Sequence, residues 1–219
     1  MPEPRVLLVD KPAGVTSHDV VAMAKNTYDV KTGHAGTLDP FATGLLIVLL
    51  EREATREQAR FMALPKTYRT VARLGALSTT GDPEGEITET GTVPAAAAEL
   101  PTGEVLQQTP AYSAVKIGGE RAYRRARRGE TLDMPPRQVT VHRFVELWRQ
   151  DGRAEYEIEC SSGTYVRSLI ADLGDAYCLE LRRTQIGPFS VDEANEAAPI
   201  PLADALARIE PATGRVHDR

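Results

Sequence analysis

The segment from Lys31 to Gly44 constrains the fold more than any other part of the chain. It contains three glycines and one proline, and the apolar run Leu45–Leu50 follows it directly. Glycine and proline at this density oppose both a helix and a strand that pairs in a ladder. A short continuous apolar run predicts a buried strand. We therefore expect an irregular loop mounted on a core strand, with Gly33, Gly36 and Gly44 available for positive φ.

Two side chains in this loop are candidates for chemistry. They are the carboxylate of Asp39 and the imidazole of His34. Asp39 precedes Pro40, which biases the Asp39 backbone toward the extended region and restricts where the carboxylate points. Aspartate is also a favoured turn residue. An ordinary Asp-Pro turn beside a loop histidine therefore explains the composition of the loop equally well.

The overall composition is that of a globular protein with a substantial core. The 219 residues are 42% hydrophobic and 26% charged. Cys160 and Cys178 belong to no CxxC pair or His/Cys cluster, which indicates a reduced protein without a structural zinc. The first residues lack the layout of a signal peptide, and no apolar run approaches the roughly 20 residues that span a membrane. We therefore expect a cytoplasmic protein with no membrane partner.

Hydrophobic periodicity predicts both strands and helices. Residues 66–74 and 154–160 alternate as half-buried strands do, and Asp151-Gly152 is a hairpin signal. Thr16 or Ser17 is suited to cap a helix. Residues 78–85 are predicted to form a solvent-exposed turn. Further strands are predicted at 5–10, 45–50, 139–148 and from Glu86, and helices at 53–63, 95–98, 166–173 and 201–209. This mixture predicts an α+β fold with a mixed, mostly antiparallel central sheet flanked by helices.

Two residues within these elements are candidates for a site. Tyr68 shares the inner face of its strand with Thr70 and Ala72, where a tyrosine is most often simply part of the core. Arg167 lies in the first turn of a predicted helix, where the helix dipole disfavours a cation by roughly 0.3–1 kcal/mol. A buried anion such as Asp39 accounts for this placement, and snorkelling of the side chain to solvent is the alternative.

One segment is strongly basic although the net charge of the chain is −5. It contains a predicted short helix closed by Gly129, and Glu120 is its one acid. A charge run is most often a solvated face, but a nearly single-signed run with Tyr123 among the arginines suits an RNA backbone. Its cations are Lys116, Arg121, Arg124, Arg125, Arg127 and Arg128. By contrast, the glutamates of the strand 154–160 form an acidic face that we expect to repel RNA.

The sequence lacks the motifs of several other enzyme classes. It contains no GxxxxGK[ST] phosphate loop and no GxSxG nucleophile elbow. Its histidines have no metal-ligand spacing to one another. These histidines are His18, His34, His142 and His217. The remaining candidate is a carboxylate paired with an arginine and flanked by a histidine and a tyrosine, and it is expected to act without cofactor or metal.

Several segments resemble the TruB family of tRNA pseudouridine synthases. The longest is Gly33-His-Ala-Gly-Thr-Leu-Asp-Pro-Phe-Ala-Thr-Gly44, which resembles the catalytic motif of that family. Other family-like segments occur in the family's order, from about Val6 to Phe189. They are residues 11–17, 66–74, 109–116, 163–167 and 179–189. The resemblance implies the pseudouridine synthase fold, with a basic lobe inserted near residues 104–137.

The resemblance also implies a role for each candidate residue. Asp39 is the expected nucleophile, kept ionised by Arg167, and Tyr68 is expected to hold the detached base. Attack at C1′ of the ribose, or another route that breaks the glycosidic bond, frees that base. His34, Tyr165 and Leu181 complete the expected substrate-binding set, and the cations of the basic segment are expected to contact the RNA backbone.

The implied function is conversion of uridine 55 to pseudouridine in the T arm of tRNA, by a monomer without a cofactor. Two alternatives stay open on sequence alone. One is an RNA-binding or tRNA-folding protein with secondary or lost catalysis, and the other is a nucleotide-binding carboxylate enzyme of a different class. We expect a catalytic domain over residues 1–190 and a short C-terminal tail over residues 191–219, in place of a full C-terminal RNA-binding domain.

Overall fold

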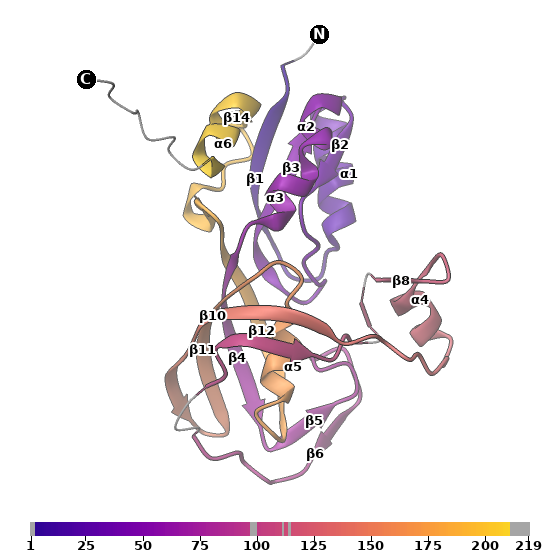
Figure 1. Ribbon diagram of the computed structural model, residues 1–219, viewed down its shortest axis with the longest axis vertical. Helices are drawn as coiled ribbons and strands as arrows, with labels where there is room; N and C mark the ends of the chain where they lie inside the picture. Colours follow the sequence, from indigo (N-terminus) through magenta and orange to yellow (C-terminus); the bar gives the residue numbers. More distant parts are fainter. Residues whose placement is uncertain (1–2, 97–99, 111, 114, 211–219) are drawn as a thin grey trace, which may run out of the picture.

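The apolar strands predicted from the sequence assemble into one large sheet. The computed structural model describes residues 3–96, 100–110, 112–113 and 115–210, without the side chains of residues 116, 117, 123 and 127. Figure 1 shows the sheet extending through both halves of the molecule. Its strands are β1 (Arg5–Lys11), β2 (Thr32–His34), β3 (Thr43–Leu50), β4 (Lys66–Leu74), β7 (Gly103–Gln107), β10 (Arg137–Gln150), β11 (Arg153–Cys160), β12 (Ala176–Ile186), β13 (Phe189–Ser190) and β14 (Ile200–Pro201).

The order of these strands is β14-β1-β3-β12-β4-β11-β10-β7, with β2 paired to β3 and β13 paired to β12. Among the described residues, every pairing in this sheet is antiparallel except that of β3 with β12. The prediction of a mixed, mostly antiparallel sheet is therefore confirmed. Two further ladders are small: β5 (Ala76–Ser78) with β6 (Ile87–Glu89), and β8 (Lys116–Ile117) with β9 (Glu120–Arg121).

Strand β3 is apolar without alternation because both of its faces are covered. Leu45, Ile47 and Leu49 belong to one core cluster, and Leu46, Val48 and Leu50 belong to another on the opposite face. A strand buried on both sides has no position that favours a polar residue. The sequence prediction of a buried strand behind the loop is confirmed.

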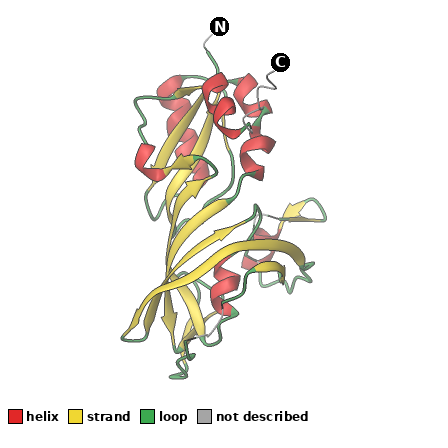
Figure 2. Cartoon of the chain, turned by 60° about the vertical axis from the view of Figure 1, so that its left-hand side comes forward, coloured by secondary structure: helices red, strands yellow, loops and turns green. Residues whose placement is uncertain are grey.

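Helices cover this part of the sheet on both faces (Figure 2). Helix α1 (Ser17–Tyr28) starts at Thr16, which forms a capping box with Asp19, and it packs beside β2 and β3. Helices α2 (Arg52–Arg56), α3 (Gln58–Ala63) and α6 (Leu202–Ile209) contribute to the opposite core cluster. Within the described residues, no helix combines the length and the apolar character that crossing a membrane requires.

The other half of the sheet contains the alternating strands. In β11, Ala154, Tyr156 and Ile158 are fully buried, while the intervening glutamates are partly exposed. Asp151 and Gly152 both have positive φ, as a tight hairpin turn requires. Helix α5 (Val166–Ala171) packs on β12 and joins the core of this half. Between β7 and β10 the chain leaves the sheet to form β8, β9 and α4 (Ala122–Arg127), which project to one side in Figure 1.

Several local predictions were wrong. The glycine-rich loop does contain a short ladder strand, β2, and Gly33 within it does not have positive φ, whereas Gly36 and Gly44 do. The predicted helix 53–63 is broken at Glu57 into α2 and α3, so that Ala54 and Phe61 both reach one core cluster. In the predicted helix 95–98, residues 95 and 96 are not helical, and residues 97 and 98 lie outside the described residues.

The two halves of the sheet meet where β3 and β12 pair in parallel over only two residue pairs. These pairs are Thr43 with Arg182 and Gly44 with Arg183. Gly44 has φ 105°, and a Cβ atom there would lie 2.2 Å from the carbonyl oxygen of Arg183. The close approach of the two strands therefore requires glycine at this position.

We predict that Gly44→Ala strongly destabilises the protein. Positive φ costs a residue with a Cβ atom about 1–2 kcal/mol, and the forced backbone shift adds about 1–3 kcal/mol. Gly14→Ala is the matched control, because Gly14 also has positive φ but has open space around the added Cβ. Urea unfolding followed by circular dichroism is expected to show a clearly larger loss for Gly44→Ala. Equal losses would contradict a steric role for Gly44.

Candidate active site

The loop that carries Asp39 is held in place by the segment that precedes α1. The Lys11 ammonium, fully buried, donates to the carbonyl oxygen of Pro40 at 3.2 Å. The Ser17 hydroxyl donates to the Leu38 carbonyl at 3.0 Å and accepts from the Leu38 amide at 2.9 Å. The backbone on both sides of Asp39 is therefore fixed by the last residue of β1 and the first residue of α1.

Arg183 holds the same loop from the other half of the sheet. Its guanidinium is 1% exposed and donates to the carbonyl oxygens of Leu45 at 2.7 Å and Gly36 at 3.1 Å. It also points toward the Thr37 carbonyl, at 3.4 Å. In the register of β4 and β12, Arg183 lies opposite Tyr68. Nothing in the sequence singles out this residue, because an arginine in a strand is usually exposed.

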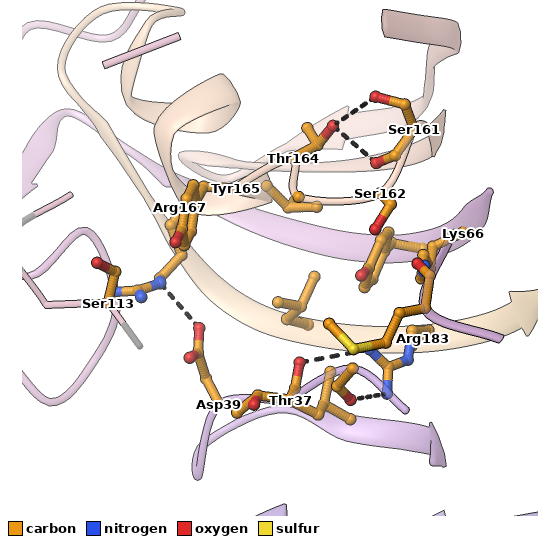
Figure 3. A pocket seen from close by; sticks show the side chains of 17 residues that line it. Thr37, Asp39, Lys66, Ser113, Ser161, Ser162, Thr164, Tyr165, Arg167 and Arg183 are labelled. Atoms are coloured by element: carbon orange, nitrogen blue, oxygen red, sulfur yellow. Dashed lines mark hydrogen bonds and ion pairs between the residues drawn. The ribbon is translucent and has the colours of Figure 1, made fainter. Parts of the chain in front are cut away.

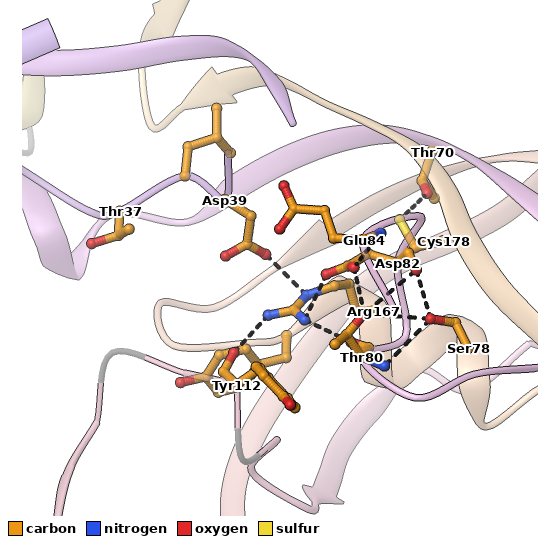
Figure 4. Close-up of polar contacts among 12 residues, drawn as sticks. Thr37, Asp39, Thr70, Ser78, Thr80, Asp82, Glu84, Tyr112, Arg167 and Cys178 are labelled. Carbon is orange, nitrogen blue, oxygen red and sulfur yellow. Dashed lines mark hydrogen bonds and ion pairs between the residues drawn. The ribbon is translucent and has the colours of Figure 1, made fainter. Parts of the chain in front are cut away.

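Arg167 lies between two carboxylates. Its Nε atom is 2.9 Å from Oδ2 of Asp39, and its Nη1 atom is 2.9 Å from Oδ2 of Asp82. The guanidinium also donates to the carbonyl oxygens of Thr80 and Tyr112 (Figure 4). These partners explain a buried cation in the first turn of α5, where the helix dipole disfavours it. The expected contact between Asp39 and Arg167 is present.

The prediction that residues 78–85 form a solvent-exposed turn is wrong at Asp82, which is buried. Its side chain is 6% exposed, because the turn folds back over α5 and points this carboxylate at Arg167. The Thr80 hydroxyl donates to it at 2.6 Å and the Glu84 amide at 3.0 Å. A Gly-Asp-Pro sequence is typical of exposed turns, so no local signal distinguishes this aspartate from an ordinary turn residue.

The two carboxylates around Arg167 differ in their exposure to solvent. The Asp39 side chain is 36% exposed, against 6% for Asp82. Burial nevertheless raises the pKa of the Asp39 carboxyl, and the nearby charge of Asp82 raises it further. Arg167 opposes this rise, in the sense expected from the sequence, but the net direction of the pKa shift is upward. Asp39 is therefore a carboxylate that is accessible to solvent and is not strongly stabilised as an anion.

A cavity of about 240 Å³ opens beside Asp39. This volume is below that of typical drug-sized ligand pockets. Four of the predicted substrate-binding residues line it together with Asp39, and they are Tyr68, Tyr165, Arg167 and Leu181. Figure 3 shows Asp39 and Arg167 at one end of the cavity and Lys66 and Arg183 at the other. We call it the base pocket.

A second hollow, of about 540 Å³, adjoins the base pocket at Asp39 and Arg167. His34 lines this hollow and not the base pocket, so it is separate from Tyr68. Burial lowers the pKa of His34, which favours a neutral imidazole, and its buried Nδ1 atom has no hydrogen-bond partner among the described residues. We call this hollow the cleft.

The predicted cations of the basic segment occupy different environments. Arg121 and Arg124 line the cleft, as His34 does. Arg125 pairs with Glu130 at 2.7 Å, and Arg128 pairs with both Glu120 and Glu130. The side chains of Lys116 and Arg127 lie outside the described residues. Of the four cations whose side chains are described, two therefore line the hollow that Asp39 also lines.

The arrangement is suited to nucleophilic chemistry on a flat substrate. It combines a reachable carboxylate, a neighbouring guanidinium and a cavity walled by Tyr68, Tyr165 and Leu181. The part of the chain that the structure describes contains no group of three His, Cys, Asp or Glu side chains that could hold a metal ion.

We predict that the two partners of Arg167 contribute differently to stability. Asp82→Asn is expected to lower the free energy of unfolding by about 1.5–3 kcal/mol, because it removes a buried hydrogen-bonded charge. Asp39→Asn makes the same chemical change beside the same arginine, at a site that is more exposed and where burial disfavours the anion. It is expected to be neutral or stabilising. Urea unfolding at pH 7.5 measures both, and a larger loss for Asp39→Asn would contradict this account.

Comparisons with known proteins agree on one family. A family model described as TruB family pseudouridylate synthase (N terminal domain) matches residues 23–166. A protein from Corynebacterium glutamicum named tRNA pseudouridine synthase B is 41% identical, over 99% of this chain and 81% of its own length. A protein of the same name from Mycobacterium tuberculosis is 41% identical, over 93% of this chain and 74% of its own length.

Solved structures give the same result. A chain in a Cbf5-Nop10-Gar1 complex is 30% identical with a TM-score of 0.63, and the match covers 86% of this chain and 50% of that one. A chain in an H/ACA RNP bound to a substrate RNA containing 2′-deoxyuridine is 25% identical with a TM-score of 0.63, over 93% and 61% of the two chains. The predicted fold class is confirmed, and the chain belongs to the TruB family of pseudouridylate synthases.

Proposed function

We propose that this chain converts uridine 55 in the T arm of tRNA to pseudouridine, with Asp39 as the nucleophile and without metal or cofactor. The relatives named tRNA pseudouridine synthase B support tRNA as the substrate. The observation that carries the proposed mechanism is the contact of Asp39 with Arg167 at the entrance of the base pocket. The proposal includes a cytoplasmic monomer whose catalytic domain covers residues 1–190, with β14 and α6 of the following segment packed onto it.

In the proposed reaction the Asp39 carboxylate attacks C1′ of the ribose. A C1′–O bond forms, the C1′–N1 bond breaks, and the electron pair of that bond stays on N1 of the base. The base turns within the base pocket and C5 bonds to C1′, which releases the carboxylate. The C5 proton is lost and N1 takes up a proton, so uridine and pseudouridine have the same composition. Arg167 orients the carboxylate throughout, because its own position is fixed by Asp82.

The base pocket holds the detached base during this turn. Tyr68 is 8% exposed and lies on the face of β4 that lines the pocket, so its ring offers a fixed surface for stacking. Tyr165 and Leu181 form further walls. A base must leave its stack to enter, at a cost of a few kcal/mol. In the proposal, contacts elsewhere on the RNA offset that cost.

The cleft supplies those contacts in the proposal. His34, Arg121 and Arg124 line it next to Asp39, where the strand on either side of a flipped nucleotide must pass. Cations there contact phosphates, and a neutral imidazole contacts bases or sugars. Strand β11 is less suitable as an RNA face, because it carries a row of glutamates that pair with Arg69 and Arg143.

We predict that the protein modifies a T-arm RNA hairpin at the target uridine and that Asp39→Asn reduces the rate by at least about 1,000-fold, because the nucleophile is lost. Reverse-transcription stops after carbodiimide treatment map the pseudouridine. Binding of the hairpin to both proteins is measured in parallel as a control for folding. Equal modification by the variant would exclude Asp39 as the nucleophile, and binding without modification by the parent would favour an RNA-folding protein.

We also predict that Arg121 and Arg124 contact phosphates. The double variant Arg121→Gln, Arg124→Gln is expected to weaken hairpin binding and to reduce the slope of log K against log salt by about 1.4–1.8, since each phosphate contact contributes about 0.7–0.9. Arg128→Gln is the matched control, because this arginine is engaged by Glu120 and Glu130. If Arg128→Gln also reduced the slope by about 0.7–0.9, the amount expected for one phosphate contact, the assignment of these contacts to Arg121 and Arg124 would be contradicted.

A further inference from the structure

Two buried cations line the base pocket without a carboxylate partner. Lys66 is 5% exposed and Arg183 is 1% exposed, and neither forms an ion pair with any of the described residues. Arg167, at the opposite end of the pocket, is paired with two carboxylates. Unpaired buried cations are costly in stability. Their place in the pocket wall therefore calls for a functional explanation.

The Lys66 ammonium is positioned at the edge of the pocket by the end of α3. It donates to the carbonyl oxygens of Met62 and Leu64, and its side chain lines the cavity (Figure 3). An ammonium has three donors, and none of the described residues takes the third. Burial, together with the nearby charge of Arg183, lowers the pKa of Lys66 to about 8. The group is therefore a cation at neutral pH that gives up its proton in mildly alkaline solution.

Arg183 adds a permanent positive charge to the same end of the pocket. Its guanidinium faces the carbonyl oxygens of the loop at Gly36 and Thr37, and it lies opposite Tyr68 on the neighbouring strand. Burial raises the pKa of the Tyr68 hydroxyl, and Arg183 opposes that rise. The end of the pocket distant from Asp39 is thus positive and contains a neutral tyrosine.

The proposed reaction creates negative charge in this pocket. When the C1′–N1 bond breaks, its electron pair remains on the base, and the uracil anion spreads the charge over N1, O2 and O4. Fixed cations placed where charge develops stabilise the transition state more than the neutral ground state. A flat, aromatic-walled pocket with Asp39 at one end and two cations at the other meets this requirement.

We propose that Lys66 contacts the detached base and, with Arg183 behind it, stabilises the uracil anion that leaves C1′. This inference rests on the proposed function. The competing explanation is structural: Lys66 ties the last turn of α3 to β4 through the Met62 and Leu64 carbonyls and has no part in the reaction. The two explanations differ in their predictions for a variant without the Lys66 charge. Only if Lys66 stabilises the anion does the loss of rate depend on the acidity of the leaving base.

The test compares uridine with 5-fluorouridine at the target position of the T-arm hairpin. Fluorine makes the ring more acidic, so the departing anion needs less stabilisation. Single-turnover rates of formation of the C-linked nucleoside, measured by nuclease digestion and mass spectrometry, are expected to fall about 100–1,000-fold for Lys66→Met with uridine. The loss with 5-fluorouridine is expected to be at least 10-fold smaller. Lys66→Arg is expected to restore most of the rate.

The pH dependence of the rate is a second measurement. If Lys66 had only a structural role, replacing it by arginine would leave this pH dependence unchanged. In the parent, the rate with uridine is expected to fall as the pH rises through about 8, because Lys66 loses its proton. In Lys66→Arg this alkaline limb is expected to disappear from the same pH range, since a guanidinium stays charged. Arg60→Gln, which removes an exposed cation on α3, is the matched control and is expected to leave both rates unchanged.

Four results would overturn the inference. An unchanged rate in Lys66→Met, or an equal loss with both bases in a variant that still binds the hairpin, would make Lys66 a structural residue. An alkaline limb that persists in Lys66→Arg would assign that limb to another group and remove the support for Lys66. A parent that binds the hairpin and modifies neither uridine nor 5-fluorouridine would instead overturn the proposed function, and this inference with it.

Discussion

The guanidinium of Arg167 joins four segments that are far apart in the sequence. Helix α5 carries it, the loop before β3 supplies Asp39, the turn between β5 and β6 supplies Asp82, and the chain before β8 supplies the Tyr112 carbonyl. A buried cation is strongly destabilising unless it is paired and hydrogen-bonded. The segments that bury Arg167 must therefore come together as the fold forms, and Asp82 is the partner on which stability depends most. Asp39, Asp82 and the chain that leads into the basic segment are consequently parts of one unit.

The same loop also depends on the narrow junction between the two halves of the sheet. Lys11 and Ser17 hold it from the half that contains β1, and Arg183 holds it from β12 in the other half. Only Gly44 allows the two strands to approach closely enough for both sets of contacts. The base pocket lies at this junction because its walls come from β4, β12 and α5 while Asp39 comes from the other side. The position of Asp39 relative to the pocket walls therefore depends on contacts from both halves of the sheet.

Sequence reasoning was most successful where a local rule acts alone. Alternation in β4 and β11, the continuous apolar run of β3 and the cap of α1 at Thr16 predict the elements that form. The contact of Arg167 with Asp39 was also expected, since a cation in a first helical turn is unfavourable and a buried anion was one of two explanations for it. Asp82, Lys66 and Arg183 were missed for a common reason. Each looks like an exposed turn or strand residue, and only tertiary packing buries it.

These missed residues show how the site separates its charges. Asp39 and Asp82 share Arg167 at one end, and Lys66 and Arg183 stand without acids at the other. Direct ion pairing between the ends would be the more stable arrangement for the free protein, but it would neutralise the field across the pocket. Keeping them apart costs stability and leaves a fixed field directed from the cations toward Asp39. In the proposed reaction, a base that leaves C1′ as an anion is drawn against the direction of that field, away from Asp39 and toward the positive end.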